Sequence, residues 1–372
     1  MAANGLYPGK GKETFYRPVP FDYISCGPSA FPVLNEIDDF SLSKLLVDLG
    51  AKLILSEVDK RPLTNTLDLV KAILAKQREE DTDITEVNVV GPYAKGTAVA
   101  TDSSVELIVT VKTIPTRTAV ATDSSVELIV TVKTIPTPTS MNSRMDKFCE
   151  LMKLNPACQL LIFEKLDTGF FVRNPANNVS VRVMFTIPTS HFCDHKAEIH
   201  VDKAALKEAS NSLRRTVWFI GRAKRSALEN FVRILLDVKK RFVGMHALQD
   251  WHLELYAYHS LSGLTPSGQP ISLAQAFKRF FQILSAGALL PDTPTLADPL
   301  VIGPACSKVH LTAFYKMEEL DEICQAAQAI CRLIMMGHFY EVLGLTPLAE
   351  GDPRLFSQKA YNPEDDSSLT SQ

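Results

Sequence analysis

The stretch VVGPYAKGTAVATDSSVELIVTVKTIPT (89–116) decides the fold of this 372-residue chain. It begins at the end of an apolar segment, passes through a Gly-Pro turn, and continues after a loop into the run VELIVTV (105–111). A β-branched apolar run of this length is typical of a strand inside a sheet, and the single glutamate within it faces one side. The stretch therefore predicts two sheet strands joined at a glycine turn.

Residues 97–116 recur without a change at residues 118–137, and Arg117 alone separates the two copies. Identity at every position indicates a recent tandem duplication or an exon counted twice, because an old repeat changes at its exposed positions. A single duplication is no solenoid, which needs at least three stacked units. Deleting 21 residues restores one uninterrupted domain, so we expect the copies to compete for one place in the sheet. The spare VELIVTV run is an aggregation hazard unless it is covered.

Composition is that of a globular protein of about two domains, with 46% hydrophobic and 22% charged residues. The net charge of −3 excludes strong global attraction to nucleic acid, which would need a local basic patch. No apolar run approaches the ~20 residues that span a bilayer, and the N-terminus lacks a signal-peptide core. We therefore expect an intracellular protein whose seven scattered cysteines stay reduced.

Hydrophobic periodicity predicts a first half that mixes helices and strands and a second half that is helical. The domains expected are an extended leader (1–38), a mixed-sheet domain (39–198), a helical domain (199–345) and a disordered tail (346–372). The fold class is thus α+β. The expected helices cover 41–58, 63–78, 143–154, 204–218, 226–242, 248–259, 273–286 and 317–336; the expected strands cover 84–90, 105–111 or its twin 126–132, 159–166, 169–173 and 179–185.

A strand, a glycine turn, a loop and a carboxylate-bearing strand form the motif of nucleotidyltransferases. The turn lets backbone donors approach a triphosphate, and two carboxylates spaced i, i+2 hold Mg²⁺ from one face of the strand. Taken alone, Gly91-Pro92 followed by Val105-Glu106-Leu107 is a weak form of it, since many strands carry a glutamate.

The stretch 89–116, together with five further segments in the same order, resembles the DZF domain family. The resemblance covers about residues 21 to 345 and implies a nucleotidyltransferase-like domain followed by an all-helical domain similar to that of oligoadenylate synthetases. It also implies lost catalysis, no cofactor, and a heterodimer with a DZF-containing double-stranded RNA-binding protein. The family further implies work in RNA metabolism, DNA binding and transcription regulation in the nucleus and possibly the cytoplasm. The segments are FDYISCGPSAFP (21–32), DTGFFVRNPANNVSVRVMFTIP (167–188), HVDKAALKEASNSLRRTVWF (200–219), FKRFFQILSAGALLP (277–291) and ICRLIMMGHFYEVLG (330–344).

The residues agree with lost catalysis, and we therefore predict that the chain is no enzyme. In active relatives the first strand carboxylate would fall at Ser104 (or Ser125), and a third would be expected on strand 181–185, which has none. Pro92 follows the glycine where those enzymes place serine, which removes a hydroxyl and an N–H. Lys95 is interpreted as a solvated loop lysine. The predicted vestigial nucleotide and metal cleft consists of Gly91, Pro92, Lys95, Ser104 and Glu106.

A basic patch flanks Trp218 and Phe219, and such a patch could follow a phosphate backbone. The competing interpretation, which we favour, is an amphipathic helix with both aromatic residues in the core. The loop His191–His195, with His200 beyond, has the look of a metal cluster, but we expect a polar connection and no metal. The possible RNA contacts are Arg214, Arg215, Arg222, Lys224 and Arg225.

The end of the helix predicted at 317–336 extends its apolar character around the helix, which suits burial against a second chain. The residues Leu333, Ile334, Met335 and Met336 are the candidate dimer surface, within a region from about 290 to 345. Two alternatives stay open. One is a working template-free nucleotidyltransferase that uses Glu106, and the other is a module that binds RNA directly.

Overall fold

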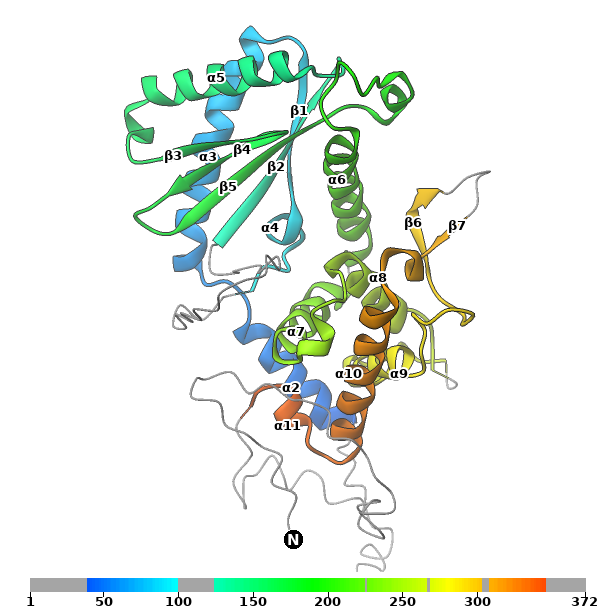
Figure 1. The fold of residues 1–372 in the computed structure, drawn as a ribbon. Helices are drawn as coiled ribbons and strands as arrows, with labels where there is room; N and C mark the ends of the chain where they lie inside the picture. Colours follow the sequence, from blue (N-terminus) through cyan, green and yellow to red (C-terminus); the bar gives the residue numbers. More distant parts are fainter. Residues whose placement is uncertain (1–38, 100–123, 225, 266–267, 303–307, 346–372) are drawn as a thin grey trace, which may run out of the picture. The chain divides into compact units, whose positions relative to one another are not determined.

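The computed structural model describes residues 39–99, 124–224, 226–265, 268–302 and 308–345 (Figure 1). The described residues divide into two compact units: residues 54–99 and 124–224 form a sheet unit, and residues 39–53, 226–265, 268–302 and 308–345 form a helical unit. The α+β class expected from the sequence is confirmed. The leader, the tail, Ser104, Glu106 and Arg225 lie outside the described residues.

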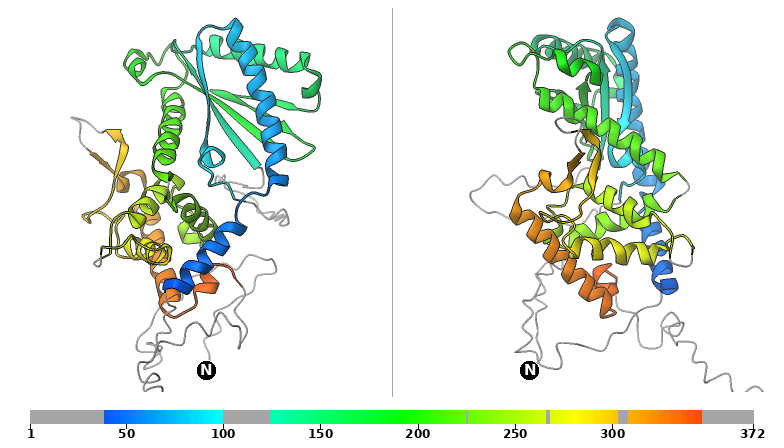
Figure 2. Two further views of the ribbon diagram at one scale, coloured as in Figure 1. Left: turned by 180° about the vertical axis from the view of Figure 1, so that it is seen from behind. Right: turned by 90° about the vertical axis from the view of Figure 1, so that its right-hand side faces the viewer.

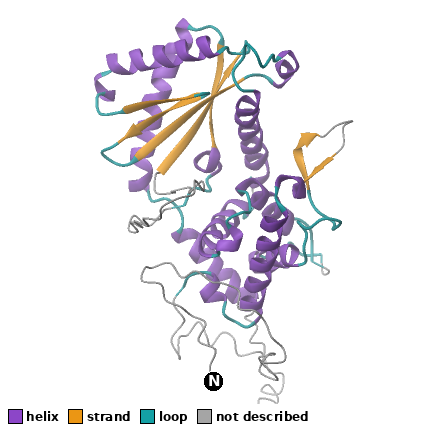
Figure 3. Ribbon diagram, in the orientation of Figure 1, coloured by secondary structure: helices purple, strands orange, loops and turns teal. Residues whose placement is uncertain are grey.

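The sheet unit is built on a five-stranded sheet of order β1-β2-β5-β4-β3 (Figure 3). Strands β2 and β5 are parallel, and the other neighbours are antiparallel. Its elements are α3 (Glu57–Glu80), β1 (Ile84–Val90), α4 (Gly91–Lys95), β2 (Ser124–Val132), α5 (Pro138–Leu154), η2 (Pro156–Cys158), β3 (Ile162–Leu166), β4 (Gly169–Asn174), β5 (Val179–Thr186), η3 (Thr189–Asp194) and α6 (Lys203–Ala223).

Strand β2 comes from the second copy of the repeat. It pairs with β1 from Ile84↔Val132 to Val90↔Glu127, and with β5 from Ser124↔Val179 to Thr131↔Thr186. A strand with a neighbour on each side has no free edge, so β2 is an interior strand of the sheet. The strand of the first copy, 105–111, lies outside the described residues.

Different helices cover the two faces of the sheet (Figure 2), and the side chains of β2 alternate between these faces. Val126, Leu128, Val130 and Val132 are buried in a core that α3 and α5 complete. On the other face, Ile129 packs with residues of β1 and α6. The period of two along a strand thus puts Glu127 on the α6 face.

A charged cluster fastens the loop between α3 and β1 to helix α5. The Arg144 guanidinium donates from Nε to Asp81 Oδ2 at 2.8 Å and also pairs with Asp83. Asp83 in turn accepts from the backbone N–H of Thr134, at 3.2 Å, just after β2. Arg144 is 12% exposed, so its charge is held by these carboxylates more than by water.

The helical unit is packed around aromatic side chains. Phe280 lies edge-on to Phe281, with ring centroids 5.1 Å apart, and to Phe231, at 6.2 Å. Trp251 donates from Nε1 to the buried carboxylate of Asp298 at 2.9 Å, which joins α8 to β6. The elements are α2 (Asp39–Lys52), α7 (Leu228–Arg241), η4 (Val243–Met245), α8 (Asp250–Leu261), α9 (Leu273–Ser285), β6 (Ala297–Ile302), β7 (Lys308–His310), η6 (Leu311–Phe314), α10 (Met317–Met335) and α11 (Phe339–Val342).

The boundaries of the two units differ from the domain boundaries expected from the sequence. Helix α2 packs on α7 and α9 and so belongs to the helical unit, whereas α6 packs on α4 and β5 of the sheet unit. The expected helix 41–58 ends early at Lys52, because Ser56 caps a new helix by accepting from the Asp59 N–H at 3.2 Å.

The capping box expected at Ser226 is not formed. Its hydroxyl accepts from the Leu228 N–H at 3.3 Å, and Ala227 is the N-cap of α7. Capping boxes occur instead at Thr137, which begins α5, and at Ser272, which begins α9.

We predict that Arg144→Met lowers the free energy of unfolding by about 2 kcal/mol, because two part-buried carboxylates lose their cation. The measurement is urea unfolding followed by circular dichroism. The matched control is Lys165→Met, whose partner Asp146 is 59% exposed; exposed pairs contribute about 0–1 kcal/mol. Equal losses for the two variants would contradict the assigned role of the cluster.

Candidate functional site

The candidate site lies where β1 ends and helix α4 begins. Gly91 has φ of +77°, a left-handed conformation that residues with a Cβ rarely adopt. A Cβ on Gly91 would also lie 3.1 Å from Glu127 Oε2 on the neighbouring strand. Glycine is therefore favoured at this turn by its backbone conformation, and a Cβ would in addition make the Glu127 carboxylate shift by a few tenths of an ångström.

Helix α6 supplies a partner for the first N–H of the turn. The Gly91 N–H donates to Thr216 Oγ1 at 3.3 Å, and the Thr216 hydroxyl donates to the Ser212 carbonyl at 2.9 Å. Pro92 stands in the first turn of α4, where an absent N–H costs little. Its carbonyl accepts from the Thr97 N–H at 3.0 Å. Thr216 of α6 and Thr97, which follows α4, thus fix the turn through hydrogen bonds to its backbone.

Lys95 corrects the interpretation of a solvated lysine. Its side chain is buried, and its ammonium lies 5.6 Å from the centroid of the Phe219 ring. The reason is that residues 91–95 form a helix rather than a loop, and this helix packs on α6. An ammonium over an aromatic face gains a cation–π attraction that grows as water is removed.

Glu127 faces a cation across the sheet. Its neighbour on β5 is Arg182, with Nη1 3.6 Å from Glu127 Oε1. The Glu127 side chain is 28% exposed and the Arg182 side chain is 42% exposed. The pair is therefore open to solvent, and its charges are partly screened. The Arg182 guanidinium also lies 5.7 Å from the Phe171 ring, which has Arg173 at 5.5 Å. At this face of the sheet Glu127 thus pairs with Arg182, which in turn lies over an aromatic ring that it shares with Arg173.

Neither Arg182 nor Thr216 was predicted from the sequence as a residue of the site. Arg182 occupies the strand on which a third carboxylate was expected, directly opposite Glu127. An arginine among the apolar residues of 179–186 was a signal, but only the strand register shows which residue it faces. In the part of the chain that the structure describes, no group of three or more His, Cys, Asp or Glu residues could hold a metal ion.

The chemistry available at the turn follows from these groups. Glu127 can accept hydrogen bonds or contribute one oxygen ligand to a cation, and Arg182 can donate to a phosphate or carboxylate. Because the two are ion-paired, a ligand of either one competes with the other.

The predicted RNA contacts are only partly free to reach a ligand. Arg214 and Lys224 are exposed, whereas Arg215 pairs with Glu208 at 2.8 Å. Arg222 stacks 4.0 Å above the half-buried Trp218. Phe219 is buried in the core, as the amphipathic-helix interpretation expects for one of its two aromatic residues.

The histidines of the loop before α6 contact the backbone. His191 Nδ1 lies 2.9 Å from the Lys133 carbonyl, and His195 Nε2 lies 2.8 Å from the Val201 carbonyl. His200 Nδ1 accepts from the Lys196 N–H at 2.9 Å. These contacts fix a polar connection between β5 and α6.

The candidate dimer surface is smaller than the four residues expected. Ile334 lies in the core, while Leu333 and Met336 are half-buried and Met335 is 47% exposed. Four successive residues of a helix cover its whole circumference, so one of them must face its own domain. At the other end of α10, Met317 is 53% exposed.

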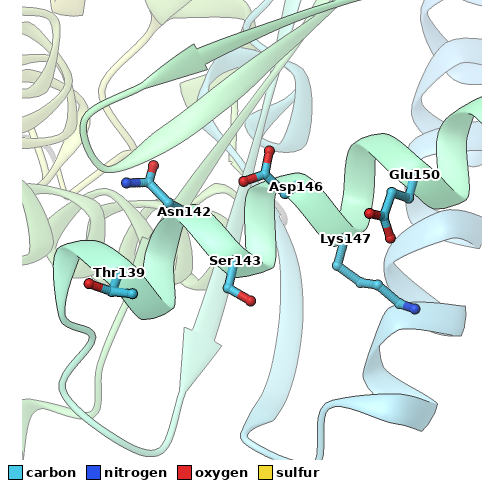
Figure 4. A pocket seen from close by; sticks show the side chains of 6 residues that line it. All are labelled: Thr139, Asn142, Ser143, Asp146, Lys147 and Glu150. Atoms are coloured by element: carbon cyan, nitrogen blue, oxygen red, sulfur yellow. The ribbon is translucent and has the colours of Figure 1, made fainter.

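A hollow along α5 carries no comparable site (Figure 4). Two of its charged groups are already paired, Lys147 with Glu80 at 2.9 Å and Asp146 with Lys165 at 2.6 Å. The hydrogen bond and the charge of Glu80 raise the pKa of Lys147. The lining residues are Thr139, Asn142, Ser143, Asp146, Lys147 and Glu150.

The helical unit matches a known family. Residues 227–360 match the DZF C-terminal domain. This match covers most of the helical unit and supports the resemblance to the DZF family that the sequence motifs indicate. None of the helices in the described ranges combines the length and apolarity needed to cross a bilayer.

Solved structures with a similar fold include one with RNA terminal uridylyl transferase activity. A CdnC protein of E. coli MS115-1, in complex with HORMA-deltaN, is 14% identical with a TM-score of 0.52, over 83% of this chain and 98% of that one. Cid1, described by its RNA terminal uridylyl transferase activity, is 11% identical with a TM-score of 0.53, over 83% and 99%. A chain of the GLD-2/RNP-8 complex is 10% identical with a TM-score of 0.51, over 84% and 100%. The nucleotidyltransferase-like fold is thereby confirmed.

These comparisons contradict the prediction that the chain is no enzyme. The fold it shares is that of nucleotidyltransferases, including one with terminal uridylyl transferase activity. The prediction depended on Ser104 (or Ser125), on Pro92 and on the absence of a third carboxylate from strand 181–185. Ser125 lies in β2, Arg182 lies in β5 and Pro92 is accommodated at the start of α4, so these residues are departures from the motif within a fold that enzymes share.

We predict that Gly91→Ala destabilises the sheet unit by about 1–2 kcal/mol, because alanine is strained at positive φ and its Cβ crowds Glu127. Gly221→Ala is the matched control, since a Cβ there meets no atom within 4 Å. Alanine in a helix interior stabilises by up to about 1 kcal/mol over glycine. Thermal unfolding of both variants measures the two effects, and destabilisation by both would contradict the assigned geometry.

Proposed function

We propose that this chain is a nucleotidyltransferase-fold subunit that pairs, through its helical unit, with a DZF-containing double-stranded RNA-binding protein. The observation that carries the proposal is the match of residues 227–360 to the DZF C-terminal domain. We further propose, from the segments quoted in the sequence analysis, that within the DZF family the chain resembles interleukin enhancer-binding factor two, the 45-kilodalton nuclear factor. The complex would then act in RNA metabolism and transcription regulation in the nucleus, with RNA held mainly by the partner.

The end of α10 offers a suitable contact area. Met335 is exposed beside the half-buried Leu333 and Met336, and methionine adapts its shape to a partner surface at little cost. Interfaces have an apolar centre in which such side chains are enriched. A stable interface buries about 1,600 Å² in total, so the contact must extend beyond these residues over neighbouring parts of the helical unit.

A fold neighbour offers a precedent for such pairing. The GLD-2/RNP-8 structure contains a chain of this fold within a complex of two different proteins. At 10% identity this likeness shows the fold alone, and it is a precedent for the architecture and not for the partner.

Affinity purification of the full chain from cells, with identification of the copurifying proteins, tests the proposed partner class. We expect recovery of a DZF-containing protein with double-stranded RNA-binding domains, at a mass that fits one copy of each chain. Recovery of the chain without any DZF-containing protein would contradict the proposal.

We predict that Met335→Glu weakens pairing with that partner at least tenfold, because a buried unpaired charge is costly. Met317→Glu is the matched control, since it changes the same residue type with similar exposure at the opposite end of α10. Titration by calorimetry or surface plasmon resonance measures both affinities. Equal affinities for the two variants would remove the end of α10 from the interface.

A second candidate function is template-free nucleotidyl transfer. The observation that favours it is the carboxylate of Glu127 held beside the glycine turn, in a fold shared with Cid1. The test is incorporation of each labelled nucleoside triphosphate into an RNA primer with Mg²⁺ or Mn²⁺, by the protein and by the Glu106→Gln/Glu127→Gln variant. Incorporation that the double variant loses would establish this function, and incorporation that it retains would remove both glutamates from the mechanism.

A further inference from the structure

The position of strand β2 in the sheet is defined by contacts that two segments of this chain can make. Residues 103–111 have the same sequence as residues 124–132, which form β2. Every partner of β2 on β1 and on β5 lies outside the repeat. The position therefore contains nothing that distinguishes one copy from the other.

The chain on both sides of β2 is anchored by residues that also occur twice. Before the strand, the Thr97 N–H donates to the Pro92 carbonyl at 3.0 Å, and Val99 bridges to Ile54. After it, the Lys133 N–H donates to the Asp83 carbonyl at 3.0 Å. The described arrangement thus uses the head of the first copy with the strand and tail of the second.

We propose that the protein has two folded arrangements, which differ in whether residues 124–132 or residues 103–111 occupy the place of β2. In the described arrangement, 24 residues separate Val99 from Ser124. In the other, three residues separate Val99 from Ser103, and the extra 21 residues follow the strand. This connection is the one that a chain with a single copy would have.

The two arrangements have similar free energies. The buried side chains and the ladder hydrogen bonds of the strand are the same in both, since the sequences are identical. The cost of closing a connection grows only with the logarithm of its length, so moving the extra 21 residues from one side of the strand to the other changes little. Thr137 caps α5 in both, because it is the copy that directly precedes the helix.

The register of the sheet permits this exchange and forbids smaller shifts. A slip by one residue would turn Val126, Leu128 and Val130 from the buried core to the α6 face. A shift by one whole repeat returns the same residue to every position. Exchange requires β2 to leave its place between β1 and β5, so the two arrangements interconvert only through partial unfolding of the sheet unit.

Substitution of one buried leucine in each copy tests the proposal in the full chain. Leu128 is fully buried in β2, and its counterpart is Leu107. We expect Leu128→Asp alone and Leu107→Asp alone to keep the fold, because the unchanged copy fills the place. Loss of one of two arrangements of equal free energy halves the equilibrium constant for folding, which lowers the melting temperature by about 1–2 °C. The double variant is expected to lose the cooperative unfolding transition of the sheet unit.

A chain that lacks residues 97–117 provides the reference, since it retains one copy. In that background Leu128→Asp must abolish the transition, which shows that the substitution is disruptive. Loss of the fold by Leu128→Asp in the full chain, with Leu107→Asp unchanged, would overturn the proposal and fix β2 as residues 124–132. Retention of the fold by the double variant would overturn it as well, because the place would then need neither copy.

Discussion

The pairing of β2 between β1 and β5 is the constraint on which the rest of the sheet unit depends. The antiparallel register with β1 puts Glu127 opposite the end of that strand, and so beside Gly91. The parallel register with β5 puts the same carboxylate opposite Arg182. The alternation of side chains then gives one face to the core with α3 and α5 and the other to α6. The candidate site is therefore a consequence of register.

Much of the fold could be predicted from the sequence, because hydrophobic periodicity is local. The strands at 84–90 and 179–186 and the helices α9 and α10 lie within a residue or two of the expected ranges. The site could be predicted only in part. Lys95 was expected in solvent, and its burial depends on Phe219, which is 124 residues away in the chain. A contact between residues so far apart in the chain produces no periodic pattern in the sequence.

Two further features could not be derived from local pattern. The apolar run 333–336 shows that one end of α10 is apolar all round, but the packing of the helix decides that Ile334 faces the core and Met335 faces outward. The identical copies of VELIVTV are equivalent by any sequence measure, and the register of the structure assigns β2 to the second. Arg182 was visible as a charge in an apolar strand, yet its partner was not.

The features that support a function differ between the two units of the chain. The sheet unit has the fold of nucleotidyltransferases and a carboxylate at its glycine turn, while the helical unit matches the DZF C-terminal domain. The proposed pairing surface and the glycine turn thus belong to different units of the chain. Such a protein can take part in a complex through the surface of its helical unit, whichever ligand the glycine turn of its sheet unit binds.

Hydrogen–deuterium exchange of the chain, alone and with its DZF-containing partner, tests whether the pairing surface lies on the helical unit. We expect binding to slow exchange in peptides from the C-terminal end of α10 and from α11, within residues 331–345, and to leave β3 and β4 unchanged. Slower exchange confined to the sheet unit, or no change in either unit, would contradict a subunit that pairs through its helical unit.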